Sequence, residues 1–423
     1  MSIGKMGFWS VFAVGVGGMV GGIFPVLGLA VELTHKGAPL AFAIAGMVAL
    51  ITTYAYAKLS VAYPSRGGTV PFLTQAFGTG LVSGSLNLLL WLSYVVMLSL
   101  YFSAFGSYGA SLFPESFQSF WKHFLISITV VGISGLNLLS ADIVGKAQKW
   151  IVGFKLGILL LFIAIGIWQI DFPQIEATGT SLLPMVSGGM IIFLSYEGFE
   201  LIANTAEDVI NPRQMPLAYY SAVVFVIVLY VLIALVAVGT LPVENIVAAR
   251  DYALARVASP VMGEFGVISM TIAALLSTTS AINATFYGSA RLSYVIAQSK
   301  NQLHVLEKEV INKQHLGLFI ISGLTLIFAN FFDLSRISTM GSAGFLLIFA
   351  AVNLANVRLY RQTQNCRWIS LLGACLCVAA LIVLCAQTAR TDPQALWVMA
   401  ILLALAIGLD VIYCLFTNCE LRL

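Results

Sequence analysis

Long apolar runs separated by short polar segments dominate this chain. Most of these runs exceed the roughly 18 residues that a helix needs to cross the hydrocarbon core of a bilayer. The pattern predicts about twelve membrane-spanning helices, at about 8–33, 38–63, 81–110, 120–140, 147–169, 182–205, 217–241, 264–298, 316–332, 337–358, 368–388 and 395–417. No polar segment between them is long enough for a soluble domain. Residues 1–423 are therefore expected to form a single transmembrane domain.

The composition indicates which medium surrounds the helices. The chain is 60% hydrophobic and 9% charged, and its mean hydropathy is +0.96. A soluble domain carries roughly 25% charged residues, so most of this surface must face lipid. We therefore expect an all-α integral membrane protein. The net charge of +3 is small and the basic residues lie between apolar runs, which argues against nucleic acid as a partner.

Lysines and arginines concentrate in alternate loops, and cytoplasmic loops carry an excess of both residues. The larger set, expected in the cytoplasm, comprises Lys5, Lys58, Arg66, Lys146, Lys149, Arg213, Arg291, Lys300, Lys308, Lys313, Arg358, Arg361, Arg367 and Arg422. The smaller, outer set comprises Lys36, Lys122, Arg250, Arg256, Arg336 and Arg390. We expect a multi-pass protein of the cell inner (plasma) membrane with its N- and C-termini in the cytoplasm.

Two predicted spans contain helix-breaking sequences. The sixth carries Gly188-Gly189 and then Ser195–Gly198. The first carries Gly15, Gly17, Gly18, Gly21 and Gly22, followed by Pro25. Glycine costs a helix about 1 kcal/mol relative to alanine, so these sequences favour local unwinding. Interrupted helices at corresponding places in two halves of a chain indicate a transporter binding site.

Unwinding at membrane depth would free backbone groups that suit a small zwitterion. Freed N–H groups at the start of a half-helix suit a carboxylate, and freed carbonyls suit an ammonium or a small cation. Irregular backbone is tolerated there only beside protein or a water-filled cavity. The alternative is close helix packing, because Gly18 and Gly22 have the spacing of a GxxxG pair.

Charged residues inside the predicted spans are costly, which makes them functional candidates. Glu197, beside the second break, could hold a cationic group of a substrate, titrate as a proton site, or accept hydrogen bonds from freed backbone N–H groups. Lys155 lies roughly 8 Å beyond Trp150 at 1.5 Å per residue, so it could also snorkel to the membrane surface. Asp410, near the end of the last span, is expected to form an interfacial or interhelical pair.

The sequence offers no pattern for a metal, a cofactor or catalysis. His35, His123, His304 and His315 are expected in loops, and the cysteines, all in the last quarter, in apolar packing. There is no G-x-x-x-x-G-K-[ST] loop, no H-E-x-x-H motif and no G-x-S-x-G elbow. We therefore expect no enzyme activity, no metal site and no cofactor.

Four groups of motifs, in order along the chain, resemble the amino acid–polyamine–organocation transporters. They are Gly18–Phe24 (GMVGGIF); Tyr63–Gly68 (YPSRGG) with Phe77-Gly78; Ser195–Glu200 (SYEGFE) with Ala206–Asp208, Asn211-Pro212 and Pro216; and Asn283–Thr285 with Ser289–Arg291 and Ala297. They are similar to that family's signatures in or after its first, second, sixth and eighth helices. Two residues differ from those of many family members. Many members have an acidic residue at the position of Lys58 and a neutral residue at the position of Glu197.

The resemblance implies a LeuT-like fold of five-plus-five inverted repeats, at about 8–169 and 182–358, with two additional helices at about 368–417. It implies that the substrate carboxylate meets N–H groups near Gly22, and that the amine meets carbonyls of both breaks. The implied substrate-binding residues are Gly18, Gly21, Gly22, Ile23, Phe193, Leu194, Glu197, Ser93, Tyr94 and Thr285.

The resemblance also bears on ion coupling. In some proton-coupled relatives a fifth-helix lysine occupies the place where sodium-coupled relatives bind Na⁺, and Lys155 is similar to that position. Its ammonium could reach first-helix carbonyls and an eighth-helix hydroxyl such as Ser277. Gain and loss of its proton could then accompany the transport cycle.

Together these features predict a secondary transporter that moves amino acids by alternating access and is coupled to protons, with membrane lipid as its surroundings. Because Glu197 is acidic, two alternative functions remain: a transporter of polyamines or organic cations, and an exchanger. A sensor that binds an amino acid without transporting it is an alternative from another class.

Overall fold

The structure is a bundle of long helices. The computed structural model describes residues 6–139, 141–171, 182–298, 309–311 and 314–417. The long helices are α1 (Phe8–Met19), α2 (Ile23–Thr34), α3 (Ala38–Ala62), α5 (Leu81–Ala110), α6 (Gln118–Leu139), α7 (Ala141–Gly166), α9 (Leu182–Ile191), α10 (Met215–Thr240), α12 (Ala253–Gln298), α13 (Leu316–Phe331), α14 (Leu334–Arg358), α16 (Arg367–Thr391) and α17 (Pro393–Thr417). Lys5, His304 and Arg422 lie outside the described residues.

Shorter elements connect these helices. The short α-helices are α4 (Thr69–Phe77), α11 (Val243–Ala248) and α15 (Tyr360–Thr363), and strands β1 (Glu309–Ile311) and β2 (Gln314–His315) pair antiparallel. The 3-10 helices are η1 (Val20–Gly22), η2 (His35–Gly37), η3 (Glu115–Phe117), η4 (Ile167–Gln169), η5 (Ile192–Tyr196), η6 (Glu200–Asp208), η7 (Pro212–Gln214) and η8 (Arg250–Tyr252).

Every predicted span contains helix. The bounds of α5 agree with the prediction, and those of α3, α10 and α14 differ from it by at most three residues. Helix α12 is interrupted at Gly263, where φ is 64° and ψ is −152°, so its second part begins at the predicted residue 264. The sequence pattern does not predict α4, α11 or η8, because each is too short to produce a clear period of hydrophobicity.

By length and hydropathy, nine segments of the described chain can cross a membrane. One is Phe8–Ala62, which contains two of the predicted spans. Helix α13 is apolar but shorter, with its apolar part at Gly317–Phe331. The chain is thus a multi-pass, almost entirely helical membrane protein, and the number of twelve crossings stays a prediction.

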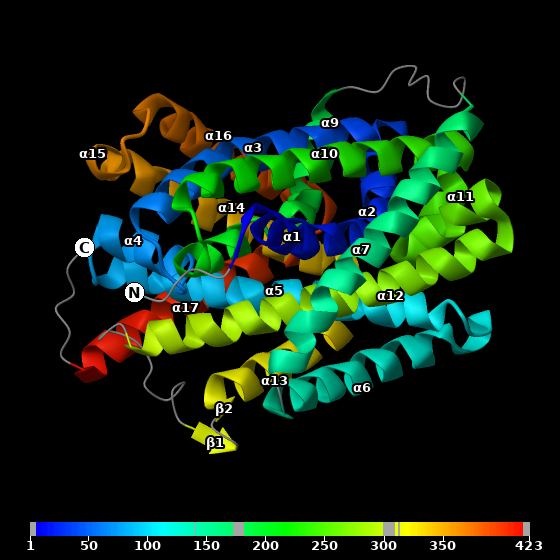
Figure 1. Ribbon diagram of the computed structural model, residues 1–423. Coiled ribbons are helices and arrows are strands. Elements are labelled where there is room, and N and C mark those ends of the chain that lie inside the picture. Colours follow the sequence, from blue (N-terminus) through cyan, green and yellow to red (C-terminus); the bar gives the residue numbers. More distant parts are fainter. Residues whose placement is uncertain (1–5, 140, 172–181, 299–308, 312–313, 418–423) are drawn as a thin grey trace.

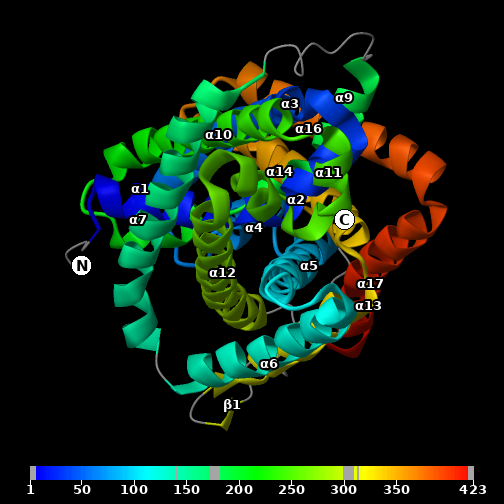
Figure 2. The ribbon, with the colours of Figure 1, turned by 90° about the vertical axis from the view of Figure 1, so that its right-hand side faces the viewer.

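The helices run side by side along the molecule (Figure 1). Seen end on, α2 and α14 lie near the middle, and α6, α7, α16 and α17 form the outside (Figure 2). Helix α3 packs on α10, while α5 packs on α12, α14 and α17. In the most apolar 18-residue stretches of α5 and α14, 94% and 89% of the residues are buried, which makes these helices part of the core.

Three smaller expectations can be compared with the structure. Asp410 accepts a hydrogen bond from the Ser85 hydroxyl at 3.1 Å, which confirms an interhelical pair. Cys377 is buried, with its Sγ 3.4 Å from the Thr52 hydroxyl, as expected of a packing cysteine. His123 lies in α6 and not in a loop, because that helix begins at Gln118.

Candidate functional site

The sixth predicted span breaks where the sequence places the break. The α-helical geometry of α9 ends at Ile191, and η5 continues to Tyr196. Glu197 then adopts an extended conformation with ψ of 149°. Gly198 follows with φ of 117°, which favours glycine because it has no Cβ, before η6 begins at Glu200. The predicted interruption at Ser195–Gly198 is confirmed.

The first predicted span changes its geometry without unwinding. Helix α1 ends at Met19, η1 forms one tight turn, and α2 begins at Ile23. The dihedral angles of Val20, Gly22 and Ile23 all stay in the right-handed helical region. A 3-10 turn pairs each N–H three residues back instead of four, so little backbone is freed. The location expected from the glycines is right, and the extent of unwinding was overestimated.

The two breaks touch each other backbone to backbone. A Cβ added at Gly198 would lie 2.6 Å from the carbonyl carbon of Gly18 and 2.8 Å from the backbone nitrogen of Met19. A Cβ added at Gly22 would lie 2.7 Å from the Cα of Ser195. These distances are too short for any side chain, so the glycines are needed for this approach. Sequence reasoning found both breaks but did not predict their contact.

Tyrosine hydroxyls hold the carbonyl groups at the junction. The Tyr230 hydroxyl, from α10, lies 2.5 Å from the carbonyl oxygen of Met19 and 3.1 Å from that of Ser195, so it bridges the two breaks. The Tyr101 hydroxyl, from α5, donates to the carbonyl oxygen of Gly18 at 3.3 Å. A buried tyrosine hydroxyl usually needs a hydrogen-bond partner. In each of these two cases, backbone at the junction supplies that partner.

Two serines of α14 hold the start of the second break. The hydroxyls of Ser338 and Ser342 donate to the Ile191 carbonyl oxygen at 2.7 and 2.8 Å. Ser342 also accepts a hydrogen bond from the Leu194 N–H at 2.9 Å. The serines are four residues apart, so they lie on one face of the helix. They satisfy backbone groups where the chain leaves α-helical geometry.

Glu200 and Tyr94 hold the other side of the second break. A carboxylate oxygen of Glu200 accepts from the Gly198 N–H at 2.7 Å, and its second oxygen accepts from the Tyr94 hydroxyl at 3.4 Å. Sequence analysis offered backbone capping as one role for Glu197. Glu200 plays this role instead, since its carboxylate accepts the hydrogen bond from the Gly198 N–H.

Glu197 is the carboxyl group of the junction that lacks hydrogen-bond partners in the described part of the chain. It is completely buried, and within the described part of the chain neither of its carboxylate oxygens has a hydrogen-bond partner. Burying a carboxyl group without a partner is costly, whether it is charged or neutral. An incoming cationic group or proton donor would reduce this cost. Glu197 is therefore buried without a partner among the described residues, whereas Glu200 is already engaged.

Lys155, on α7, reaches α1 just before the first break. Its side chain is completely buried, and the ammonium nitrogen donates to the Gly17 carbonyl oxygen at 3.0 Å. The contact with a first-helix carbonyl is as expected, and burial overturns the alternative in which Lys155 snorkels to the surface. The expected contact with Ser277 is not made, since the Ser277 hydroxyl has no hydrogen-bond partner among the described residues. The Ser277 backbone instead lies beside Gly21.

The remaining expected site residues fall into two groups. Ile23, Phe193 and Leu194 are buried at the breaks, and Thr285 is buried in α12. Ser93 is different, because it faces a separate cavity between α5 and α14, away from the junction. Its neighbour Tyr94 points to Glu200, as adjacent residues on a helix point in directions about 100° apart.

Sequence reasoning missed Tyr101, Tyr230, Ser338 and Ser342. A signal for them was present, because each is a hydroxyl within a long apolar run, where water cannot satisfy it. The sequence does not show which backbone groups they reach. Together with the glycines, they make a compact junction, and the ionisable side chains of Glu197, Glu200 and Lys155 are buried beside it.

We expect Tyr230→Phe to lower the free energy of unfolding by about 1–3 kcal/mol, because it removes the donor that two buried carbonyls share. Thermal unfolding in detergent measures this change. Tyr220→Phe, on the same helix but partly exposed, is the matched control and should change stability little. Equal unfolding temperatures for both variants would show that the Tyr230 hydroxyl does not stabilise the junction.

Comparison with known proteins gives a consistent result. Residues 6–407 match the model of a family described as amino acid permease. The chain is 33% identical to an uncharacterized protein of Methanocaldococcus jannaschii, covering 83% of this chain and 82% of that protein. It is 31% identical to the inner membrane transport protein YbaT of Escherichia coli, covering 89% of each. It is 26% identical to the methylthioribose transporter of Bacillus subtilis, covering 82% of this chain and 79% of that protein.

Proposed function

The chain belongs to the amino acid permease family of the amino acid–polyamine–organocation superfamily, and on this premise we propose that it is a secondary transporter of amino acids that works by alternating access. The observation that carries the proposal is the junction of the two broken spans, where Gly18 and Gly22 touch Gly198 and Ser195. Helix interruptions at membrane depth are tolerated where they line a binding site or are covered by protein.

The proposal includes the arrangement expected from the sequence. The inverted repeats would be about 8–169 and 182–358, followed by two additional helices. The protein would lie in the inner membrane with its termini in the cytoplasm. The E. coli relative is named an inner membrane transport protein, which supports this location.

The substrate would bind at the junction. Its carboxylate would meet backbone N–H groups near Gly21, Gly22 and Ile23, and its amine would meet carbonyls near Gly18 and Leu194. In the described conformation, several backbone groups of the junction already have hydrogen-bond partners. The Gly18 carbonyl accepts from the Tyr101 hydroxyl, and the Leu194 N–H donates to the Ser342 hydroxyl. Binding therefore requires the exchange of some of these hydrogen bonds for bonds to the substrate. This exchange gives a physical link between substrate binding and a change of conformation.

Proton coupling would involve Lys155. Its ammonium is buried and donates to one carbonyl of the first span, and no carboxylate pairs with it among the described residues. A buried ionisable group that contacts a mobile junction can change its protonation when the junction moves. The proposal is that loss of its proton accompanies one of the two conformational changes.

Uptake into proteoliposomes tests the whole proposal. We would measure a panel of labelled amino acids, together with methylthioribose, under an imposed pH gradient, an imposed Na⁺ gradient, or neither. Accumulation of an amino acid only with the pH gradient is the expected result, with protein-free liposomes as the control. Specific binding of amino acids without any uptake would favour a sensor instead.

Glu197 favours a second candidate function, the transport of a polyamine, another organic cation or a cationic amino acid. If its carboxylate holds the substrate cation, Glu197→Gln should weaken lysine binding at least about tenfold, because a buried charge pair loses one partner. Alanine binding should change little. Competition for binding of a labelled amino acid measures both affinities, and Glu264→Gln, at an exposed position on α12, is the control. Equal changes for lysine and alanine would exclude this role.

A further inference from the structure

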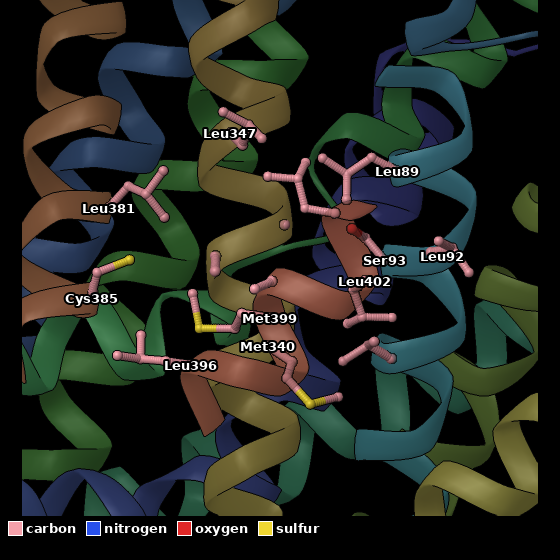
Figure 3. A pocket seen from close by; sticks show the side chains of 15 residues that line it. Leu89, Leu92, Ser93, Met340, Leu347, Leu381, Cys385, Leu396, Met399 and Leu402 are labelled. Atoms are coloured by element: carbon pink, nitrogen blue, oxygen red, sulfur yellow. The ribbon is translucent and has the colours of Figure 1, made fainter. Parts of the chain in front are cut away.

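A cavity of about 300 Å³ lies between α5, α14, α16 and α17, on the far side of α5 and α14 from the junction. Figure 3 shows side chains of these four helices converging on it. Its lining residues are Leu89, Leu92, Ser93, Val96, Met340, Ala343, Gly344, Leu347, Leu381, Cys385, Leu396, Met399, Ala400, Leu402 and Leu403.

The spacing of the lining residues shows that the cavity is built by helix faces. On α5 and α14 the lining positions repeat at i, i+3, i+4 and i+7, which is one face of a helix, and on α17 all but Leu402 follow the same repeat. Such faces usually interlock and leave no void larger than a water molecule. At Gly344 the missing side chain lets α5 approach closely, since a Cβ there would overlap the Ser93 Oγ, and the neighbouring Ala343 adds little volume. The space is thus enclosed by faces of four helices, beside the close contact of Ser93 with Gly344.

Water is a poor occupant of this cavity. A buried water needs two to four polar partners, and apart from sulfur atoms the side chains that line the cavity offer only the Ser93 hydroxyl. An empty cavity of this size would forfeit the dispersion contacts of its lining. An apolar chain is the occupant that satisfies both conditions.

The outer wall of the cavity borders the lipid. Only 33% and 22% of the residues in the most apolar stretches of α16 and α17 are buried, so these helices face outward. Ala400, on α17, lines the cavity and is exposed, and Leu403 is 39% exposed. Hydrocarbon of the membrane can therefore enter between or beside these helices.

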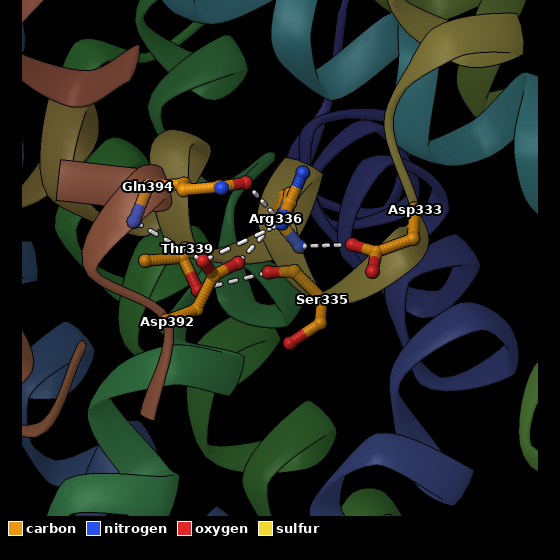
Figure 4. Close-up of polar contacts among 6 residues, drawn as sticks. All are labelled: Asp333, Ser335, Arg336, Thr339, Asp392 and Gln394. Atoms are coloured by element: carbon orange, nitrogen blue, oxygen red, sulfur yellow. Dashed lines mark hydrogen bonds and ion pairs between the residues drawn. The ribbon is translucent and has the colours of Figure 1, made fainter. Parts of the chain in front are cut away.

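The depth of the cavity fits one leaflet. Along α14, Met340 and Leu347 lie about 6 and 16 Å from Arg336 at 1.5 Å per residue. Half of the hydrocarbon core is about 15 Å thick. Arg336 lies in a partly exposed polar cluster (Figure 4), where it donates to Asp392 at 2.6 Å and to Gln394 at 3.1 Å. This cluster marks the polar boundary, and the cavity spans the acyl region next to it.

We infer that this cavity binds an acyl chain of a membrane phospholipid, from the leaflet whose headgroups lie level with Arg336. The chain would contact the reverse faces of the two helices that hold the second break. Ser93 faces the cavity while Tyr94 reaches Glu200. Gly344 faces the cavity while Ser342 holds Leu194. The lipid would therefore lie behind α5 and α14, which contact each other directly at Ser93 and Gly344.

Photocrosslinking tests this inference without any measurement of transport. The protein would be reconstituted with a phosphatidylcholine that carries a diazirine near the middle of one acyl chain. After irradiation, mass spectrometry locates the labelled residues. We expect label on Leu89–Val96 and on Met340–Leu347. In these segments the cavity-lining residues of α5 are nearly inaccessible from the bulk lipid.

Two matched variants sharpen the test. Ala400→Leu adds volume inside the cavity and should reduce the label on α5 and α14 several-fold. Ala404→Leu makes the same change one turn along α17, at an exposed residue outside the cavity, and should leave the label unchanged. Ala400 borders open cavity space and Ala404 is exposed outside it, so neither variant should prevent folding.

The inference is overturned if label falls only on outward-facing residues such as Ile401 and Leu405, or if both variants label α5 as strongly as the natural sequence. It is also overturned if a diazirine fatty acid labels these segments and the phospholipid does not, since the occupant would then be a free acid.

Discussion

Replacing Gly198 with alanine is expected to reduce substrate uptake at least about tenfold, equivalent to about 1.4 kcal/mol. Two effects add. The φ of 117° is a conformation that costs a residue with a Cβ on the order of 1–3 kcal/mol. The new Cβ would also lie 2.6 Å from the carbonyl carbon of Gly18, so the two breaks must separate. The variant loses the contact that carries the proposed binding site.

Gly157→Ala is the control for this prediction. Gly157 lies in helix α7, and a Cβ added there would have no atom of the described chain within 4 Å, apart from its chain neighbours and the backbone of its own helix. Alanine is also the better helix former, so this variant should fold and transport as well as the natural sequence. Both variants would be compared by uptake into proteoliposomes and by elution as a single species in detergent. Normal uptake by Gly198→Ala would show that transport does not need close contact between the breaks.

Replacing Lys155 with methionine is expected to reduce uptake driven by a pH gradient to the level of protein-free liposomes. Methionine keeps much of the length and removes both the ionisable group and the donor to the Gly17 carbonyl. Binding of the substrate should persist, because Lys155 contacts the backbone of the first span on the side of Gly17, before the residues proposed to hold the carboxylate. Uptake and equilibrium binding would be measured on the same preparation.

Lys155→Arg separates a proton carrier from a structural donor. Arginine keeps a donor and a positive charge but does not release its proton in proteins. If Lys155 carries a proton, the arginine variant should lose the pH-driven uptake as well. If its only role is to hold Gly17, arginine should restore uptake, which would contradict the proposal. The control is Lys58→Met. Lys58 is partly buried, and its ammonium nitrogen lies 3.5 Å from the Gln364 carbonyl oxygen.

The spans could be predicted because their signal is local. A run of apolar residues long enough to cross the hydrocarbon must form a helix, since every backbone group has to be satisfied within the segment. The bounds of α5 agree with the prediction for this reason. The break at Gly198 could be predicted as well, because it needs a glycine next to polar residues within an apolar run.

The roles of individual side chains were harder to predict. Ser93 and Tyr94 are adjacent in the sequence, and only the packing of α5 decides that one faces a lipid-side cavity and the other reaches Glu200. Glu197 and Glu200 are both acidic residues of one break. Only the folded structure shows that Glu200 accepts the Gly198 N–H and that Glu197 has no partner among the described residues.

By itself, the sequence determined that this is a multi-pass helical membrane protein with two interrupted spans, because hydrophobicity and glycine content act on neighbouring residues. The tertiary structure alone decided that the interruptions touch each other, that Tyr230 bridges them, and that Lys155 is buried against Gly17 instead of reaching the surface. These contacts join residues that lie far apart along the chain. Their energies depend on distances of a few ångströms between helices, which no periodicity of the sequence encodes.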